Sequence, residues 1–204
     1  MNTNDKYKDQ ITGLILAGGQ GTRMGKVDKG LQNFRGAPMA LHVMMKLSAQ
    51  VGQILINANQ NIPVYEGFGV PVWPDQTEGY AGPLAGLQTG LIHCETPWLL
   101  SAPCDSPFLP ADLATRLMDA ALAQNADIAV AATWSAEDQR VMRQPVFALV
   151  HASLLENLNR FLSGDNRKVD AWFRQHTVAE VVFDDASAFR NINTLQELRD
   201  FEHE

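Results

Sequence analysis

The residues that could do chemistry begin near the amino terminus, in the segment LILAGGQGTRMGKVDKGL from Leu14 to Leu31. Aliphatic residues lead there into a stretch with five glycines, and Arg23, Lys26 and Lys29 lie in the same stretch. Glycine lets the backbone approach a ligand closely and adopt conformations that other residues avoid. Free N–H groups beside fixed cations form a cradle for phosphate. The pattern therefore predicts a phosphate-binding loop that follows a buried strand.

Two common types of phosphate-binding loop fit this segment poorly. A P-loop requires a glycine where Gln20 stands and a hydroxyl residue where Val27 stands. The dinucleotide-binding fingerprint requires its third glycine where Met24 stands, and it expects an acidic residue at the end of the second strand, where Asn57 stands. An NAD-dependent oxidoreductase is therefore disfavoured.

Three short motifs place polar or small residues at expected strand ends and helix starts. INAN carries Asn57, whose amide could bind a base or ribose, and an Asx turn that closes the strand is the open alternative. VWPD ends on Asp75, a carboxylate that could accept hydrogen bonds from a guanine edge or serve as a turn or cap residue. YAGPLAGL places Gly82 before Pro83 at the start of a helix, which permits close approach of a base or phosphate or simple close packing.

A further carboxylate follows the strand WLLSAP in the motif SAPCDSPFLP. Pro103 and Pro107 bracket Asp105 and restrict the backbone around it. A fixed oxygen ligand at the carboxyl edge of a sheet suits Mg²⁺, which often bridges a carboxylate to substrate phosphates. A helix cap is the alternative, but Asp105 precedes the next expected helix by too many residues. We interpret Cys104 as packing.

The last polar motif is RNINTLQEL, near the carboxyl terminus. Thr194 precedes an apolar helical pattern, and Glu197 follows three residues later, which predicts a capping box. Asn191 and Asn193 come just before this helix, near its electropositive end.

Short apolar runs alternate with longer segments of helical periodicity. The expected strands are residues 13–18, 53–58, 70–74, 98–103, 127–132, 145–150 and 178–183, and the expected helices are 39–49, 83–93, 110–123, 151–163, 168–175 and 194–202. Pro110 is expected in the first turn of its helix. Strands buried on both faces predict an α/β fold, a three-layer sandwich with a mainly parallel, Rossmann-like sheet.

Composition narrows the class of protein. A chain of 204 residues, 46% of them hydrophobic, can bury one substantial core. The net charge of −7 argues against nucleic acid as a partner. Two cysteines, no apolar run long enough to cross a membrane and no signal peptide predict a soluble cytoplasmic protein. We expect residues 1–10 to form a flexible tail and residues 11–204 to form one domain.

The segment LAGGQGTRMGKVDKGL resembles the nucleotidyltransferase signature L-A-G-G-x-x-x-R-M-G-x-x-D-K-[GA]-L, in particular that of the molybdenum cofactor guanylyltransferase family. Relatives of that family include molybdopterin cytidylyltransferases and sugar-phosphate nucleotidyltransferases. The likeness covers nearly the whole chain after residue 11, and residues 125–180 are the least diagnostic. Ala81 stands where the family has a proline. The LAGG and RMG segments and Asn191 favour guanine over cytosine.

The resemblance implies a fold like that of the nucleotide-diphospho-sugar transferases and a transfer of GMP from GTP to molybdenum-bearing molybdopterin. The products would be molybdopterin guanine dinucleotide and pyrophosphate. It also implies transient contact with proteins that insert molybdopterin and with molybdoenzyme chaperones, and no contact with membranes. Carried over by motif, the GTP-binding residues are Leu16, Ala17, Gly18, Gly19, Lys29, Asn57, Asp75, Gly82 and Asp105.

The same resemblance assigns catalytic roles. Arg23 and Lys29 would neutralise the triphosphate and the departing pyrophosphate, and Asp105 would hold Mg²⁺. Asn191 and Asn193 would face the pterin or its phosphate. An ionised phosphate nucleophile needs no general base. The alternatives are a molybdopterin cytidylyltransferase, a sugar-phosphate nucleotidyltransferase or a non-catalytic nucleotide-binding protein.

Overall fold

A central seven-stranded sheet organises the protein. The structure is a computed structural model that describes residues 6–19, 28–76 and 82–202. The strands are β1 (Ile11–Leu16), β4 (Gln53–Asn57), β5 (Val72–Trp73), β6 (Trp98–Pro103), β7 (Ile128–Ser135), β8 (Arg140–His151) and β9 (Val178–Phe183), in the order β5-β4-β1-β6-β8-β7-β9. β8 runs antiparallel to β6 and β7, and the other four neighbouring pairs are parallel. The predicted mainly parallel sheet is confirmed.

Helices connect these strands. They are α1 (Met39–Ser48), α2 (Ile62–Glu66), α3 (Pro83–Ile92), α4 (Leu113–Gln124), α5 (Leu155–Leu162), α6 (Val169–Phe173) and α7 (Leu195–Glu202). Within the described ranges, no helix has both the length and the apolar character needed to cross a membrane.

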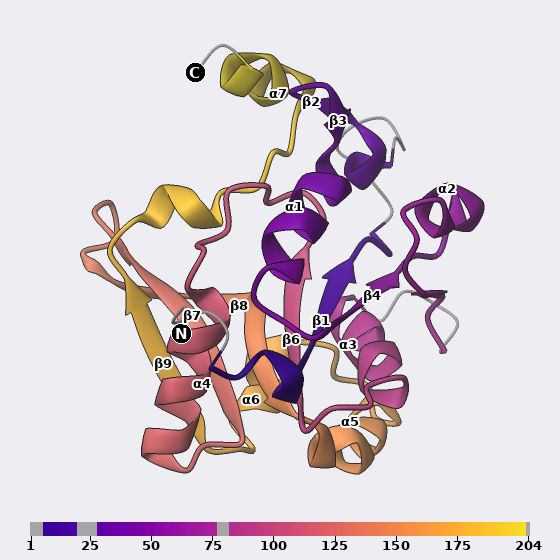
Figure 1. Cartoon of the computed structure of the whole chain (residues 1–204). Coiled ribbons are helices and arrows are strands. Elements are labelled where there is room, and N and C mark those ends of the chain that lie inside the picture. The colour runs from indigo at the N-terminus through magenta and orange to yellow at the C-terminus, as the bar shows by residue number, and fades with distance from the viewer. Residues whose placement is uncertain (1–5, 20–27, 77–81, 203–204) are drawn as a thin grey trace.

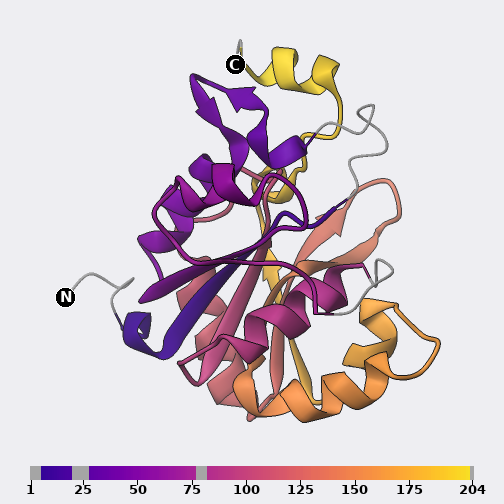
Figure 2. The same cartoon turned by 90° about the vertical axis from the view of Figure 1, so that its right-hand side faces the viewer.

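The sheet lies between two layers of helices (Figures 1 and 2). Side chains of α1 and α4 pack with Ile15 and Leu100 in one core. Side chains of α3, α5 and α6 pack with Leu14 and Leu99 in another. Consecutive strand residues point to opposite faces, so a strand that is aliphatic throughout supplies both cores. The three-layer sandwich predicted from these runs is confirmed.

Several boundaries differ from the expected ones. β1 runs from Ile11 to Leu16 instead of 13–18, β5 has two residues instead of five, and β7 continues to Ser135 instead of 132. β8 has twelve residues, twice the expected length, because its first half, RVMRQ, lacks the continuous apolar pattern that marks a buried strand. α4 begins at Leu113, so Pro110 precedes the helix and its carbonyl accepts hydrogen bonds from Gln50 Nε2 at 2.9 Å and from the N–H of Leu113 at 3.4 Å. α5 begins at Leu155 because His151 still belongs to β8 and Ala152–Leu154 form a 3₁₀ turn.

Three short elements, β2, β3 and α2, were not expected from the sequence. β2 (Asn33–Phe34) and β3 (Ala37–Pro38) form a hairpin whose turn residues, Arg35 and Gly36, have φ angles of 48° and 86°. This hairpin lies beside α7 (Figure 1), and Phe34, Ile192 and Leu198 share a small core there. α2 has five residues. Elements this short have too few residues to show a period, so their positions depend on tertiary contacts.

The residues before β1 contact α4. Lys8–Gln10 form a 3₁₀ turn. Lys6 Nζ and Tyr7 Oη both donate hydrogen bonds to Asp119 Oδ1, at 2.8 and 2.7 Å. These contacts lie at the amino-terminal end of β1, away from the edge at which the polar motifs gather.

Candidate functional site

The polar motifs meet at the carboxyl edge of the sheet. Leu16, the last residue of β1, pairs with Asn57 on one side and with Pro103 on the other. Beyond the strands, the N–H of Ala17 donates to the carbonyl of Asn57 at 2.8 Å, and the N–H of Cys104 donates to the carbonyl of Leu16 at 3.1 Å. Ligands of open α/β sheets bind at this edge. The sheet therefore brings together motifs that are dispersed along the chain.

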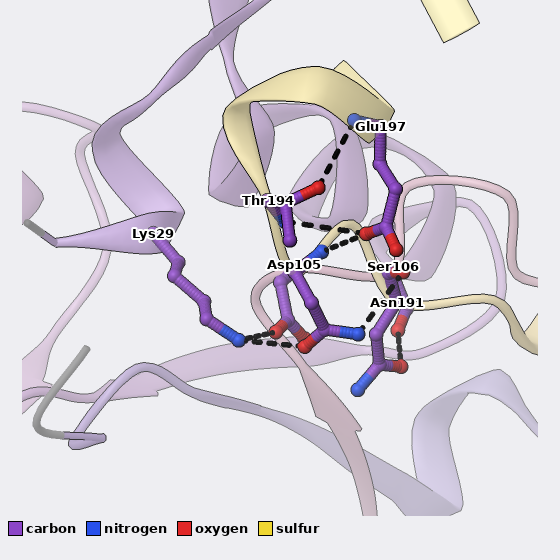
Figure 3. A network of polar contacts seen from close by, with 7 residues as sticks. Lys29, Asp105, Ser106, Asn191, Thr194 and Glu197 are labelled. Atoms are coloured by element: carbon purple, nitrogen blue, oxygen red, sulfur yellow. Dashed lines mark hydrogen bonds and ion pairs between the residues drawn. The ribbon is translucent and has the colours of Figure 1, made fainter. Parts of the chain in front are cut away.

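Lys29 and Asp105 form an ion pair at this edge (Figure 3). Lys29 Nζ lies 3.1 Å from Asp105 Oδ2 and donates to Asn193 Oδ1 at 2.8 Å. The Lys29 and Asp105 side chains are only 19% and 11% exposed, so water screens the pair weakly. The structure thus brings together three predicted site residues from three distant segments.

The segment before α7 is bonded directly to the segment after β6 (Figure 3). Ser106 Oγ donates to Asn191 Oδ1 at 2.6 Å, and the N–H of Ile192 donates to the carbonyl of Asp105 at 2.8 Å. These bonds fix Asn191 next to the predicted metal ligand. Ser106 was not predicted as a site residue, although it follows Asp105 directly in the sequence.

The predicted capping box orders the start of α7 (Figure 3). Glu197 Oε2 accepts hydrogen bonds from the N–H groups of Asn193 and Thr194, at 2.7 and 3.2 Å. Thr194 Oγ1 accepts from the N–H of Glu197 at 3.1 Å. The reciprocal bonds confirm the capping box and hold the backbone of Asn193, whose side chain contacts Lys29.

A second cluster surrounds Asp75. Its Oδ1 accepts a hydrogen bond from Asn57 Nδ2 and its Oδ2 accepts one from Asn59 Nδ2, both at 2.8 Å. Asn59 Oδ1 accepts from the N–H of Asp75 at 2.8 Å, and Asn59 Nδ2 also donates to the carbonyl of Gly18 at 3.2 Å. The predicted residues Gly18, Asn57 and Asp75 are therefore neighbours. Asn59 was missed, although its spacing of two from Asn57 could have indicated a shared side.

Glycines at this cluster are required by space or by backbone conformation. A Cβ on Gly18 would lie 2.8 Å from Asn59 Nδ2, and a Cβ on Gly86 would lie 2.5 Å from Asn57 Oδ1. Gly82, before α3, has φ 66° and ψ −157°, a conformation that is essentially restricted to glycine. At Gly19, by contrast, no atom of the described residues lies within 4 Å of the corresponding position.

A third cluster, around Asp28, was not predicted. Tyr65 Oη and Asn61 Nδ2, both from α2 or its amino-terminal flank, donate to the two carboxylate oxygens of Asp28 at 2.6 and 3.0 Å. Burial raises the pKa of Tyr65 above its usual range, so its hydroxyl is a donor at any physiological pH. Burial likewise raises the pKa of Cys104 well above its usual range, which agrees with a packing role for this thiol.

The remaining predictions concern Arg23 and the metal. Arg23 lies outside the described residues. Within the described ranges, no group of three or more His, Cys, Asp or Glu residues could hold a metal ion. Mg²⁺, however, is commonly bound by one or two carboxylates together with waters and substrate phosphates. The Asp105 carboxylate is one oxygen ligand of this kind, and the amide oxygen of Asn193 is a second, since both contact Lys29 Nζ. These residues fit a Mg²⁺ that also binds the substrate phosphates.

An α/β sandwich with a lysine–aspartate pair and an asparagine-held aspartate at its carboxyl edge has the character of a nucleotide-binding enzyme. The chain belongs to the MobA-like NTP transferase family, whose domain model matches residues 13–181. The family resemblance found in the sequence is thereby confirmed, and so is the assignment as a nucleotidyltransferase.

Two curated relatives are called molybdenum cofactor guanylyltransferase. The one from Acidovorax sp. (strain JS42) is 58% identical over 200 residues, which cover 94% of this chain and 95% of the relative. The one from Cupriavidus necator is 56% identical over 195 residues, which cover 96% and 98% of the two chains.

Solved structures share the fold at lower identity. The molybdopterin-guanine dinucleotide biosynthesis protein A from Archaeoglobus fulgidus has a TM-score of 0.77 at 20% identity, over 94% of this chain and 97% of that one. The 4-diphosphocytidyl-2C-methyl-D-erythritol synthase from Anaerococcus prevotii has a TM-score of 0.72 at 13% identity, over 96% and 97%. The predicted likeness to nucleotide-diphospho-sugar transferases is confirmed.

Proposed function

We propose that this protein transfers GMP from GTP to molybdenum-bearing molybdopterin, forming molybdopterin guanine dinucleotide and releasing pyrophosphate. The observation that carries the proposal is the contact of Lys29 with Asp105 and Asn193 at the carboxyl edge of the sheet. The names of relatives at 58% and 56% identity over nearly the whole chain support the choice of substrates.

The nucleotide is proposed to bind along the ends of β1 and β4. Backbone groups of residues 16–19 would hold the base and phosphates, and Gly82 would allow close approach at the start of α3. Asn57 and Asp75 would contact the nucleoside. The hydrogen bonds from Asn57 and Asn59 fix both oxygens of the Asp75 carboxylate in advance, so the carboxylate loses little freedom when GTP binds.

Transfer requires in-line attack of a pterin phosphate oxygen on the α-phosphorus of GTP, with pyrophosphate as the leaving group. Little covalent chemistry is asked of the protein, so positioning and charge stabilisation carry the catalysis. Lys29 would stabilise the negative charge on the phosphates, and we assign Arg23 the same role. Asp105 would hold Mg²⁺, which when bound supplies further neutralisation of the phosphate charge.

The acceptor is proposed to bind near Asn191 and Asn193. Lys29 and Ser106 donate hydrogen bonds to the Oδ1 atoms of these two asparagines. Asn193 Nδ2 also donates to the carbonyl of Asn191 at 3.4 Å. The second N–H of Asn193 and the NH₂ group of Asn191 are the parts of the amides proposed to turn toward an anion, which suits the phosphate of molybdopterin.

The proposal includes a location and partner proteins in the cell. The protein is proposed to be cytoplasmic and to make transient contacts with proteins that insert molybdopterin and with molybdoenzyme chaperones. Absence of nucleic-acid and membrane binding is expected from the net charge of −7 and the sequence pattern.

The direct test is the product formed from GTP, Mg²⁺ and molybdopterin, with the four nucleoside triphosphates in competition. Formation of the guanine dinucleotide supports the proposal, and preferential use of CTP supports the cytidylyl alternative. Binding of GTP with no turnover of any acceptor, sugar phosphates included, supports a non-catalytic nucleotide-binding protein.

The role of Asp105 is tested by Asp105→Asn. We expect this variant to stay folded and to lose transfer by at least about 100-fold, because the amide cannot replace the charge of the carboxylate toward Lys29 and Mg²⁺. Asp119→Asn is the matched control, since Asp119 also pairs with a lysine, Lys6, at 2.8 Å. Unchanged turnover of Asp105→Asn at saturating Mg²⁺ contradicts the assignment.

A further inference from the structure

Lys29 follows directly after an aspartate that is held by α2. Asp28 Oδ1 accepts from Tyr65 Oη at 2.6 Å, and its Oδ2 accepts from Asn61 Nδ2 at 3.0 Å. The carbonyl of Asp28 accepts a third hydrogen bond, from Gln32 Nε2 at 3.2 Å. Both the side chain and the backbone of Asp28 are thus fixed at the start of the short 3₁₀ turn that carries Lys29.

The other side of this turn is fixed by close packing. A Cβ on Gly30 would lie 2.4 Å from Tyr65 Oη and 3.1 Å from Cys104 Sγ. The backbone at Gly30 therefore packs closely against Tyr65 and Cys104. The Tyr65 hydroxyl bonds to Asp28 and packs beside Gly30, the two neighbours of Lys29 in the sequence.

We propose that Tyr65 and Asp28 are positioning residues that aim the Lys29 ammonium group at Asp105 and at the phosphates, an inference that rests on the proposed function. A lysine side chain is long and flexible, with about 2 kcal/mol of rotamer entropy. Fixing its Cα is an effective way to keep the ammonium group within bonding distance of both Asp105 and Asn193. α2 thereby contributes to the reaction without touching the substrate.

The bonding pattern separates this role from a simpler one. Both oxygens of Asp28 accept hydrogen bonds from α2 and its amino-terminal flank, a segment that holds none of the predicted site residues, so this carboxylate links α2 to the turn that carries Lys29. If Tyr65 were only a core residue, its ring, which is fully buried and packs against Phe68, would suffice without the hydroxyl. The hydroxyl is the part that the proposal makes functional.

Tyr65→Phe keeps the ring and removes the hydroxyl. We expect kcat/KM to fall about 10-fold, with a several-fold rise in the Kd for GTP and the rest of the loss in kcat, because Lys29 is assigned to GTP binding as well as to transfer and small displacements of catalytic groups cost large factors in rate. Tyr7→Phe is the matched control, because Tyr7 also donates a hydrogen bond to an aspartate, Asp119, at 2.7 Å but near the opposite edge of the sheet. That variant should show a similar or smaller change in melting temperature and wild-type kinetics.

The decisive measurement repeats Tyr65→Phe in a Lys29→Met background, with kcat/KM and the Kd for GTP measured in all four proteins. If Tyr65 acts through Lys29, the second substitution should change either quantity by less than about 2-fold once the ammonium group is absent. A persistent 10-fold loss, or wild-type values for Tyr65→Phe alone, overturns the proposal.

The same four proteins separate this inference from the proposed function. Failure of the wild type to form the guanine dinucleotide, or normal turnover by Lys29→Met, counts against the proposed function itself. Loss of activity in Lys29→Met together with equal effects of Tyr65→Phe in both backgrounds counts only against the positioning role. Where transfer by Lys29→Met is too slow to measure, the Kd values for GTP still decide.

Discussion

Asn59 offers a sensitive test of the nucleoside cluster, because one atom can be changed without changing the shape of the side chain. In the wild type, Asn59 Nδ2 donates to Asp75 Oδ2 at 2.8 Å and to the carbonyl of Gly18 at 3.2 Å. Asn59→Asp replaces this nitrogen with an oxygen, which cannot donate. The acceptor atom that faces the N–H of Asp75 remains. The substitution thus turns an attractive contact with a carboxylate into a repulsive one.

The size of the effect follows from that distance. A hydrogen bond to a charged group contributes about 1.5–3 kcal/mol. Two like charges roughly 4 Å apart repel by about 1 kcal/mol in water and about 4 kcal/mol at a dielectric constant near 20. Asp75 is partly buried, so the repulsion lies between these limits. Side-chain rotation relieves part of it in the free protein, and GTP binding must restore the arrangement. We expect GTP binding to weaken by about 2–3 kcal/mol, or roughly 30- to 150-fold.

Calorimetric titration of GTP into the wild type, Asn59→Asp and Asn59→Ala measures this effect. The alanine variant loses the hydrogen bonds without the repulsion, so its affinity should lie between the other two and respond little to pH. In Asn59→Asp, a proton shared between the two carboxyl groups relieves the repulsion, so affinity should recover as the pH is lowered. Wild-type affinity of Asn59→Asp at about pH 8 would refute the assignment of Asp75 to nucleotide binding.

Two further predictions concern backbone conformation and pH. Gly82→Ala should lower the stability by about 1–3 kcal/mol and weaken GTP binding, because φ 66° with ψ −157° strains any residue with a Cβ. Gly19→Ala should leave the melting temperature nearly unchanged, because no atom of the described part of the chain lies within 4 Å of the added Cβ. Burial lowers the pKa of His176 from 6.5, and the nearby Asp127 opposes this shift. The unfolded chain therefore binds a proton at His176 more readily than the folded one. The contribution of His176 to stability is complete above about pH 6.5 and is lost as the pH falls. Urea unfolding at about pH 7.5 and pH 5.5 should show a smaller loss of stability on acidification in His176→Gln than in the wild type; an equal loss would show that other groups cause it.

Much of the site could be predicted from the sequence, because the fold class fixes where strand ends meet. A strand that leads into a glycine-rich loop, and carboxylates or amides directly after other strands, must gather at one edge once the sheet is parallel. Asn57, Asp75 and Asp105 were found in this way, with the family resemblance assigning their roles. The capping box of Thr194 and Glu197 could also be predicted, because it is a local pattern of four residues.

Other features left a signal that was not used. Asn59 stands two residues after Asn57, and that spacing places two side chains on the same side of an extended segment. Ser106 stands directly after the predicted metal ligand. The short hairpin of β2 and β3 surrounds Arg35-Gly36, but only two residues on each side pair, too few for an alternating pattern.

What the sequence by itself determined was the three-layer architecture and the edge at which the polar residues collect, since these follow from periodicity and residue type within short windows, while the phosphate-binding role of the first loop stays a prediction. Only the tertiary structure decided which side chains meet. Lys29 reaches Asn193 across 164 positions, and Asp28 bonds to Asn61, just before α2, across 33 positions and to Tyr65 of α2 across 37. Contacts over such separations depend on how helices pack on the sheet, and no local pattern of residues encodes that packing.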